Sequence, residues 1–151
     1  FKFFKIISAM KIRQLSVFVE NKTGHLNEIL NILARNNINI IALTLADSSD
    51  YGLLRMLVSD PVKAVEMLRA ENCSVRIHEV LSLELEGVPG SLARILDKFT
   101  AENISIEYLY AFSFGSKSIM VMRTNNMDQA TEVIKKYQFK PIYESDLKLT
   151  V

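Results

Sequence analysis

The sequence of 151 residues contains one cysteine, Cys73, three prolines, no tryptophan and no run of like charges. A single cysteine excludes an internal disulfide and a cysteine-rich metal site, and it indicates a reducing, cytoplasmic location. Eighteen Lys and Arg residues stand against seventeen Asp and Glu residues, for a net charge of +1. Because nucleic-acid binding needs a clustered positive surface, this balance argues against it. No apolar run approaches the length of a membrane span, so we expect no membrane partner.

The chain contains one pattern twice. The segments NKTGHLNEILNILARNNINI and GVPGSLARILDKFTAENISI match when Gly24 is aligned with Gly90, which sets a constant offset of 66 residues (24 to 90). Hydrophobic positions then coincide without a gap. Self-similarity at a fixed distance indicates duplicated structural units. We therefore expect two small domains, over residues 11–80 and 81–151.

Two short segments stand outside the repeat. Residues 1–9, FKFFKIISA, are too short for a signal peptide. They are either an extension that is not native, with Met10 as the natural start, or an additional ordered strand. Residues 145–151, SDLKLTV, fall where a third copy of the first strand would begin, because Leu147 matches Leu81 at the same offset. We expect an extra C-terminal strand there.

Each copy indicates the same order of secondary structure. Alternating apolar residues predict a first strand with one buried face, at Leu15, Val17 and Val19 and again at Leu81, Leu83 and Leu85. A glycine then precedes a helix, a hairpin of two β-rich strands follows, and a second helix leads to a last strand near 75–80 or 139–143. Capped starts of the second helices are expected at Asp60–Pro61 and Asn126–Gln129. The order β-α-β-β-α-β predicts an α+β, ferredoxin-like fold, with a four-stranded antiparallel sheet and both helices on one face of each unit.

The predicted sheets have surfaces that invite association. The third strand of each copy is apolar on both faces, which is typical of a strand covered on both sides. The second strand is an edge strand with unpaired backbone groups. A unit of this size buries only about 60% of its unfolded surface. We therefore expect the copies to pack on one another, with residues 38–46 pairing with 104–112 in a continuous eight-stranded sheet, and the chain to form a homodimer.

The loops KTGHL and VPGSL, with NNINIIAL and ENISIEYL downstream, resemble the ACT domain, a small regulatory module. The resemblance covers the chain from about 11 to 143 as two tandem copies. In that family a short loop of roughly Asp, basic, Pro, Gly, any and Leu joins the first strand to the first helix. This chain departs from the pattern at Asn21 and Gly87, which replace the acidic residue, and at Thr23, where the second copy keeps Pro89. The family implies allosteric sensing of an amino acid without catalysis.

The glycine turns are also candidate ligand sites on physical grounds. Glycine before a helix lets the backbone approach a ligand, and the unsatisfied amides of the first helical turn attract an anion such as an α-carboxylate. The resemblance places the other wall at the start of the second strand of the neighbouring copy, where carbonyls and polar side chains would meet the ligand's ammonium group. The alternative is that the glycines only shape the turn. The candidate ligand-binding residues are Asn21, Thr23, Gly24, His25, Leu26, Asn39, Ile40, Val88, Pro89, Gly90, Ser91, Leu92, Ser105 and Ile106.

Residues with catalytic or metal-binding chemistry are sparse. His25 and His78 have no acidic or cysteine neighbours at ligand spacing, so we expect no metal and no other cofactor. His25 either is solvated or contacts a ligand carboxylate. Cys73 has Phe139 as its counterpart, which favours a small apolar core residue over a reactive thiol. Because no nucleophile elbow, phosphate loop or paired-histidine motif is found, we do not expect an enzyme.

Other families share this order of elements, so the fold alone does not give the function. RNA-recognition motifs need aromatic residues on the third strand, where this chain has YGLLRML and KSIMVMR. Acylphosphatase-like enzymes need a positively lined loop, and copper carriers need a Cys-x-x-Cys pair. The leading hypothesis is a cytoplasmic, non-enzymatic tandem module that binds a small amino acid between its repeats. The bound ligand would bias association with itself or with a metabolic enzyme or regulator. The alternative is a structural oligomerisation module without a ligand.

Overall fold

The structure is a computed structural model that describes the whole chain except residues 1, 3–4, 6–8, 48–49 and 150–151. The chain divides into two compact units. The first-repeat unit consists of residues 13–78 with 147–151, and the second-repeat unit consists of residues 1–12 with 79–146. Each unit contains one copy of the repeated pattern.

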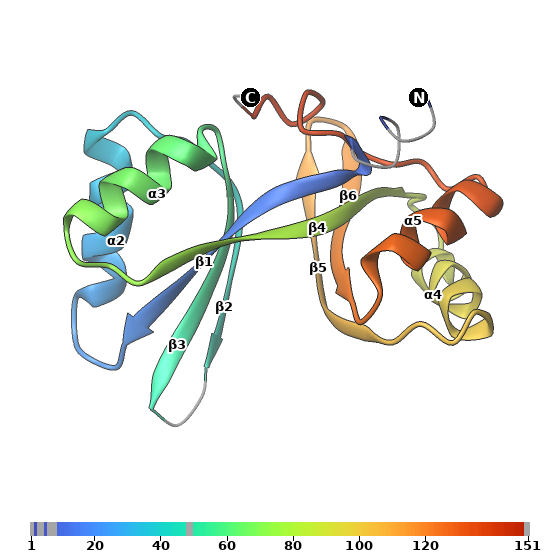
Figure 1. The fold of residues 1–151 in the computed structure, drawn as a ribbon, viewed down its shortest axis with the longest axis horizontal. Coiled ribbons are helices and arrows are strands. Elements are labelled where there is room, and N and C mark those ends of the chain that lie inside the picture. The colour runs from blue at the N-terminus through green and yellow to red at the C-terminus, as the bar shows by residue number, and fades with distance from the viewer. Residues whose placement is uncertain (1, 3–4, 6–8, 48–49, 150–151) are drawn as a thin grey trace. The chain divides into compact units, whose positions relative to one another are not determined.

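The first-repeat unit is a helix-covered antiparallel sheet. Its elements are β1 (Lys11–Glu20), α2 (His25–Arg35), β2 (Ile40–Asp47), β3 (Tyr51–Val58) and α3 (Pro61–Ala70). β3 pairs with both β1 and β2, so that Met56 lies opposite Leu15 on one side and Leu43 on the other. α2 and α3 lie on one side of these strands (Figure 1). Alternate residues of β1 therefore enter a core with the apolar stripe of α2, whose buried members include Ile29 and Leu33.

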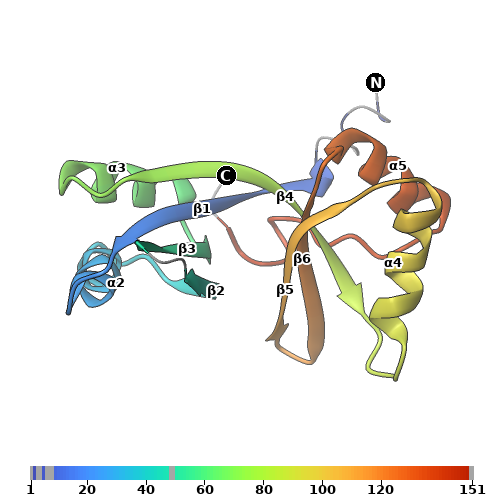
Figure 2. The same ribbon diagram turned by 90° about the horizontal axis from the view of Figure 1, so that it is seen from below.

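The second-repeat unit repeats this arrangement. Its elements after the glycine turn are α4 (Ser91–Ala101), β5 (Ile106–Phe114), β6 (Lys117–Thr124) and α5 (Met127–Lys136). β6 is the central partner, because Met122 lies opposite Leu81 of β4 (Val75–Leu85) and opposite Leu109 of β5. α4 and α5 lie on the same side of β5 and β6 (Figure 2). Phe99 of α4 is fully buried in the resulting core.

β4 joins two elements that the repeat pattern separates. The predicted last strand of the first copy and the predicted first strand of the second copy form one continuous strand, Val75–Leu85. The predicted strand near 139–143 is only an isolated bridge between Leu83 and Pro141. Two backbone hydrogen bonds flank this bridge, from Glu84 N–H to the Lys140 carbonyl at 2.9 Å and from Ile142 N–H to the Ser82 carbonyl at 2.7 Å. Pro141 has no amide hydrogen, so it cannot extend the ladder.

The described strands form a six-stranded sheet with the order β2-β3-β1-β4-β6-β5, in place of the eight-stranded sheet predicted. Two strands are missing from the expected eight because β4 serves both copies and because the last strand of the second copy is reduced to a bridge. β2 and β5 stand at the two ends of the order. The predicted pairing of 38–46 with 104–112 within the chain is therefore wrong.

The C-terminal segment differs from its prediction, and the N-terminal segment is described only in part. Over the described part of 145–151, the chain forms turns up to Lys148 and no strand, so the predicted C-terminal strand is wrong there. Of residues 1–9, the structure describes Lys2, Lys5 and Ala9, which are helical; the rest of that prediction lies outside the described residues. Among the described helices, none is long and apolar enough to cross a membrane.

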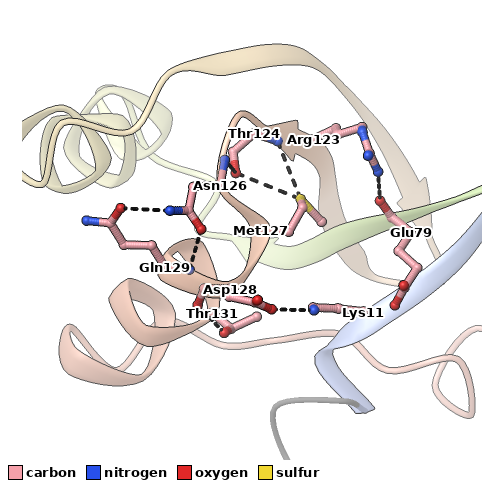
Figure 3. A network of polar contacts seen from close by, with 9 residues as sticks. All are labelled: Lys11, Glu79, Arg123, Thr124, Asn126, Met127, Asp128, Gln129 and Thr131. Atoms are coloured by element: carbon pink, nitrogen blue, oxygen red, sulfur yellow. Dashed lines mark hydrogen bonds and ion pairs between the residues drawn. The ribbon is translucent and has the colours of Figure 1, made fainter.

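The second helix of each unit starts with a side-chain cap, as predicted. The Asp60 carboxylate accepts a hydrogen bond from Lys63 N–H at 3.2 Å, and the Asn126 side chain accepts one from Gln129 N–H at 3.0 Å. The Gln129 side chain bonds back to the Asn126 side-chain amide, while the Asn126 backbone amide donates to the Thr124 hydroxyl (Figure 3). Such caps satisfy amides that have no partner within the helix.

Candidate functional site

The first helix of each unit starts differently, from a glycine. Gly24 and Gly90 precede α2 and α4 with φ angles of 88° and 83°, in the left-handed region, and neither helix start has a side-chain cap. A Cβ at Gly24 would meet nothing within 4 Å, so the backbone conformation and not the available space requires glycine there. A Cβ at Gly90 would lie 3.1 Å from Nη1 of Arg94. The predicted glycine turns are therefore present in both copies.

These helix starts leave part of their amides available. The amides of His25 and Ser91 already donate to the carbonyls of Lys22 and Val88, at 3.3 and 3.2 Å. For the amides of Leu26 and Leu92, the described residues supply no carbonyl partner. Uncapped amides at a helix start carry a partial positive charge and attract anions.

The turn of the first repeat is closed by its own side chains. His25 Nδ1 accepts a hydrogen bond from the Glu20 amide at 2.7 Å. The Lys22 ammonium lies 3.3 Å from the Glu20 carboxylate. His25 thus neither stands free in solvent nor offers Nδ1 to a ligand, and its role here is to hold the end of β1. Asn21 and Thr23 are exposed on the same turn.

The turn of the second repeat borders two hollows in its unit. The charged cavity, of about 550 Å³, is lined by Glu84, Leu85, Glu86, Gly87, Ser91, Arg94, Ile95, Ser116, Lys117, Ser118, Gln138, Phe139 and Lys140. The turn groove, of about 570 Å³, is lined by Leu85, Glu86, Val88, Gly90, Ser91, Leu92, Ala93, Leu96 and Ser118. Both volumes lie in the range of small-molecule sites. The structure therefore brings together Val88, Gly90, Ser91 and Leu92 of the predicted site, beside Pro89.

Ser91 is one of three polar residues that line both hollows, with Glu86 and Ser118. It is 9% exposed, and its hydroxyl has no hydrogen-bond partner among the described residues. Within the described residues, the Ser82 hydroxyl is the buried side-chain group without a partner, whereas the Ser91 hydroxyl retains accessible surface and can donate a hydrogen bond to a bound molecule or accept one from it. An unpaired hydroxyl at the wall of a cavity is thus a candidate ligand contact.

The charged cavity holds side chains of both signs that do not pair with each other. Its five charged residues are Glu84, Glu86, Arg94, Lys117 and Lys140, and none of them forms an ion pair within the described part of the chain. Among the described residues, the one hydrogen bond made by their side chains is from Arg94 Nη1 to the Pro89 carbonyl, at 3.4 Å. Separated charges of opposite sign are the groups that bind a zwitterion.

The residues predicted for the second wall have partners within their own repeat. Asn39 exchanges two hydrogen bonds with Ser59, from its amide to the Ser59 hydroxyl and from the Ser59 amide to its carbonyl, both at 2.9 Å. Ser105 does the same with Asn125, at 3.0 and 3.1 Å. Ile40 and Ile106 pack against the two hydrophobic cores. That these four residues contact a ligand stays a prediction.

Sequence reasoning missed the cations and acids of the charged cavity. They come from four separate stretches, the end of β4, the first turn of α4, the start of β6 and the segment after α5, so no local motif unites them. Aligning the two copies at the offset of 66 residues nevertheless reveals these cations. Arg94, Lys117 and Lys140 replace Glu28, Tyr51 and Ser74 of the first copy.

Cys73 and the histidines show no sign of metal or redox chemistry. Cys73 is half-buried against the first-repeat core. Burial, and then the charge of Glu71 and other nearby carboxylates, raises the pKa of its thiol. A raised pKa lowers the thiolate fraction, as expected for a structural cysteine. Within the described residues, no three His, Cys, Asp or Glu side chains gather as metal ligands.

Comparison with known proteins supports the resemblance found in the sequence. Protein BT0572 from Bacteroides thetaiotaomicron is 41% identical, with a TM-score of 0.87 over 93% of this chain and 97% of that chain. The ligand-free regulatory subunit of aspartate kinase from Thermus thermophilus is 12% identical, with a TM-score of 0.57 over 84% of this chain and 92% of that chain. A structure of aspartokinase alpha and beta subunits is 19% identical, with a TM-score of 0.52 over 83% and 95%. The last two show likeness of fold alone.

None of the curated proteins compared matches the chain. The family model described as the ACT domain pair matches residues 10–151. This match spans both glycine turns and both sets of helices, and it confirms the predicted family. The chain belongs to the ACT domain pair family, a family of regulatory modules.

Proposed function

We propose that this protein is a non-catalytic regulatory module that binds a small amino acid at the second glycine turn. The observation that carries the proposal is the charged cavity, where charged side chains of both signs that form no ion pair line the same hollow as the unpaired, solvent-accessible hydroxyl of Ser91. An amino acid carries one carboxylate and one ammonium group. Arg94 and the Ser91 hydroxyl suit the carboxylate, and Glu84 or Glu86 suits the ammonium group.

The low-similarity structures support an amino acid as the ligand class. Escherichia coli aspartokinase III, solved in complex with lysine and aspartate, is 18% identical, with a TM-score of 0.50 over 91% of this chain and 31% of that chain. Regulatory subunits of aspartate kinase share the fold as well. An amino-acid ligand for this chain is thus consistent with the ligands of a protein that shares its fold. Which amino acid binds is argued from the residues that line the charged cavity.

The regulatory output in this proposal is a change in association, with a second copy of the chain or with a metabolic enzyme or regulator. β2 and β5 end the strand order and leave one edge of backbone groups unpaired within the sheet. On β2, Leu43 and Leu45 are 49% and 48% exposed. A ligand shifts such an equilibrium only through different affinities for the associated and free states. The predicted contacts at Asn39, Ile40, Ser105 and Ile106 are one means to that difference.

The exposed apolar edge of β2 also favours the second candidate, a structural oligomerisation module without a ligand. In that case the chain associates equally well with and without amino acids. The two candidates therefore differ in one observable, the effect of an amino acid on the protein.

The direct test is thermal unfolding in the presence of each of the twenty amino acids at millimolar concentration. A ligand at 100 times its Kd stabilises the folded state by about 2.7 kcal/mol, which is a shift of several degrees for a protein of this size. We expect at least one amino acid to raise the Tm. If none does, the sensing function is wrong and the structural module remains.

A further inference from the structure

The two copies of the repeat have opposite electrostatics at the positions that line the charged cavity. The cavity's cations Arg94, Lys117 and Lys140 have the counterparts Glu28, Tyr51 and Ser74 in the first copy. The acidic residue Glu84 has the counterpart Phe18, and Glu86 has Glu20. The first copy therefore has no cation at any of these five positions.

Three of these counterparts in the first copy, Phe18, Tyr51 and Glu20, make contacts within their own repeat. The rings of Phe18 and Tyr51 lie 5.1 Å apart between centroids. Glu20 is held by Lys22, and its amide by His25 Nδ1. In the second copy Ser91 stands at the His25 position, and its short side chain leaves the Glu86 amide without a partner among the described residues.

The net charge of the side chains that line the charged cavity indicates the net charge of its ligand. Three cations and two carboxylates line it, none of them in an ion pair within the described residues. Four of the five charged side chains are exposed and the fifth, Glu84, is half-buried, so water screens each charge. The net charge of +1 on the lining still attracts a ligand of net charge −1 more strongly than a neutral zwitterion. A ligand with a net charge of −1 would bring the site to neutrality.

We propose that the charged cavity selects an amino acid with a second carboxylate, and that one such molecule binds per chain. This inference rests on the proposed function and names the ligand class of the same site. The two carboxylates of the ligand are shared among Arg94, Lys117 and Lys140, and its ammonium group lies between Glu84 and Glu86. The first copy does not bind the same ligand, because it has Glu28, Tyr51 and Ser74 where the cations stand.

Isothermal titration of the full chain tests the ligand class with near-isosteric pairs. L-aspartate and L-glutamate are titrated beside L-asparagine and L-glutamine, which keep the shape and lose the second charge. We expect one of the two acids to bind at least about tenfold more tightly than its amide, because the amide lacks one partly screened charge pair. We also expect one binding site per chain. Succinate or glutarate, which lack the ammonium group, should bind more weakly than the matching amino acid.

A double variant and a control variant test whether Lys117 and Lys140 cause the preference for the acid over the amide. Lys117→Tyr with Lys140→Ser gives the second copy the residues of the first, and we expect the preference for acid over amide to vanish while the weaker amide affinity stays. The matched control, Lys63→Ser on α3, removes a lysine outside the cavity and should keep the preference. Urea unfolding of both variants shows whether the fold is intact.

Three outcomes overturn the inference. They are equal affinity for acid and amide, two equivalent sites per chain, and an acid preference that survives in the double variant. In all three cases an amino acid still binds and the proposed function stands. If no amino acid binds at all, the proposed function fails and this inference fails with it.

Discussion

Gly24 and Gly90 are the residues on which the backbone of both turns depends. Their φ angles of 88° and 83° cost a residue with a Cβ roughly 1–2 kcal/mol. We expect Gly24→Ala and Gly90→Ala each to lower the free energy of unfolding by about that amount in urea denaturation. Asparagine at the same positions should cost less, because it tolerates the left-handed region.

Gly87 supplies the matched control for this prediction. It lies on the second turn, a Cβ there would meet nothing within 4 Å, and its φ is not in the left-handed region. Gly87→Ala should therefore leave stability within about 0.5 kcal/mol of the wild type. An equal loss in all three variants would show that the turns do not require glycine for the stated reason.

Cys73 allows a test at the same scale that depends on pH. Burial and the nearby carboxylates raise the pKa of its thiol, so the neutral form persists to higher pH than in a free cysteine. We expect alkylation by iodoacetamide to be slower than for free cysteine at pH 8 and to rise through a midpoint above the ordinary thiol range. Glu71→Gln should move that midpoint down. A midpoint at or below that of free cysteine would contradict the structural role.

Single residues also show what the sequence could and could not reveal. The glycine turns were predictable because left-handed glycine before a helix has a local signature at Gly24 and Gly90. The role of His25 was not, because its bond to the Glu20 amide depends on where β1 ends. The cations of the charged cavity come from separate elements, so only a comparison of the two copies could have found them.

At the scale of elements, the helix caps are the most local feature. Asp60 and Asn126 occupy equivalent positions in the two units, and each accepts a hydrogen bond from an amide of the first helical turn. We expect Asp60→Ala and Asn126→Ala each to reduce stability by about 1 kcal/mol in urea unfolding. Glu132→Ala, on the exposed side of α5, should change it by less than about 0.5 kcal/mol. If Asp60→Ala and Asn126→Ala leave the free energy of unfolding unchanged, these caps do not stabilise the helices and this account is wrong.

The sheet was the element least well predicted, and the reasons are physical. The repeat offset places a boundary after Val80, but no glycine, proline or turn residue interrupts Val75–Leu85, so the strand continues. At the other end, Pro141 limits the last strand of the second copy to a bridge. These two local facts convert the predicted eight strands into six. The helices and hairpins were predicted because their periodicity and turns are local.

At the scale of the whole molecule, the free edge of β2 governs association in this account. Leu43 and Leu45 make that edge apolar and exposed, and charged residues are the usual protection of such edges. We expect Leu45→Lys to weaken self-association in sedimentation velocity experiments, while Val62→Lys, a similarly exposed position on α3, leaves it unchanged. If both variants associate like the wild type, the β2 edge is not the contact.

The central claim is that the second glycine turn binds an amino acid through the charges around it, and calorimetric titration of the wild type beside Arg94→Glu tests it most directly. This substitution gives the second copy the residue of the first, on an exposed position of α4, so the fold should be kept. Glu28→Gln in the first copy is the control. The expected result is saturable binding of an amino acid by the wild type and the control, with at least about tenfold weaker binding by Arg94→Glu. Equal binding by all three proteins, or heat of binding from none of them, would contradict the account.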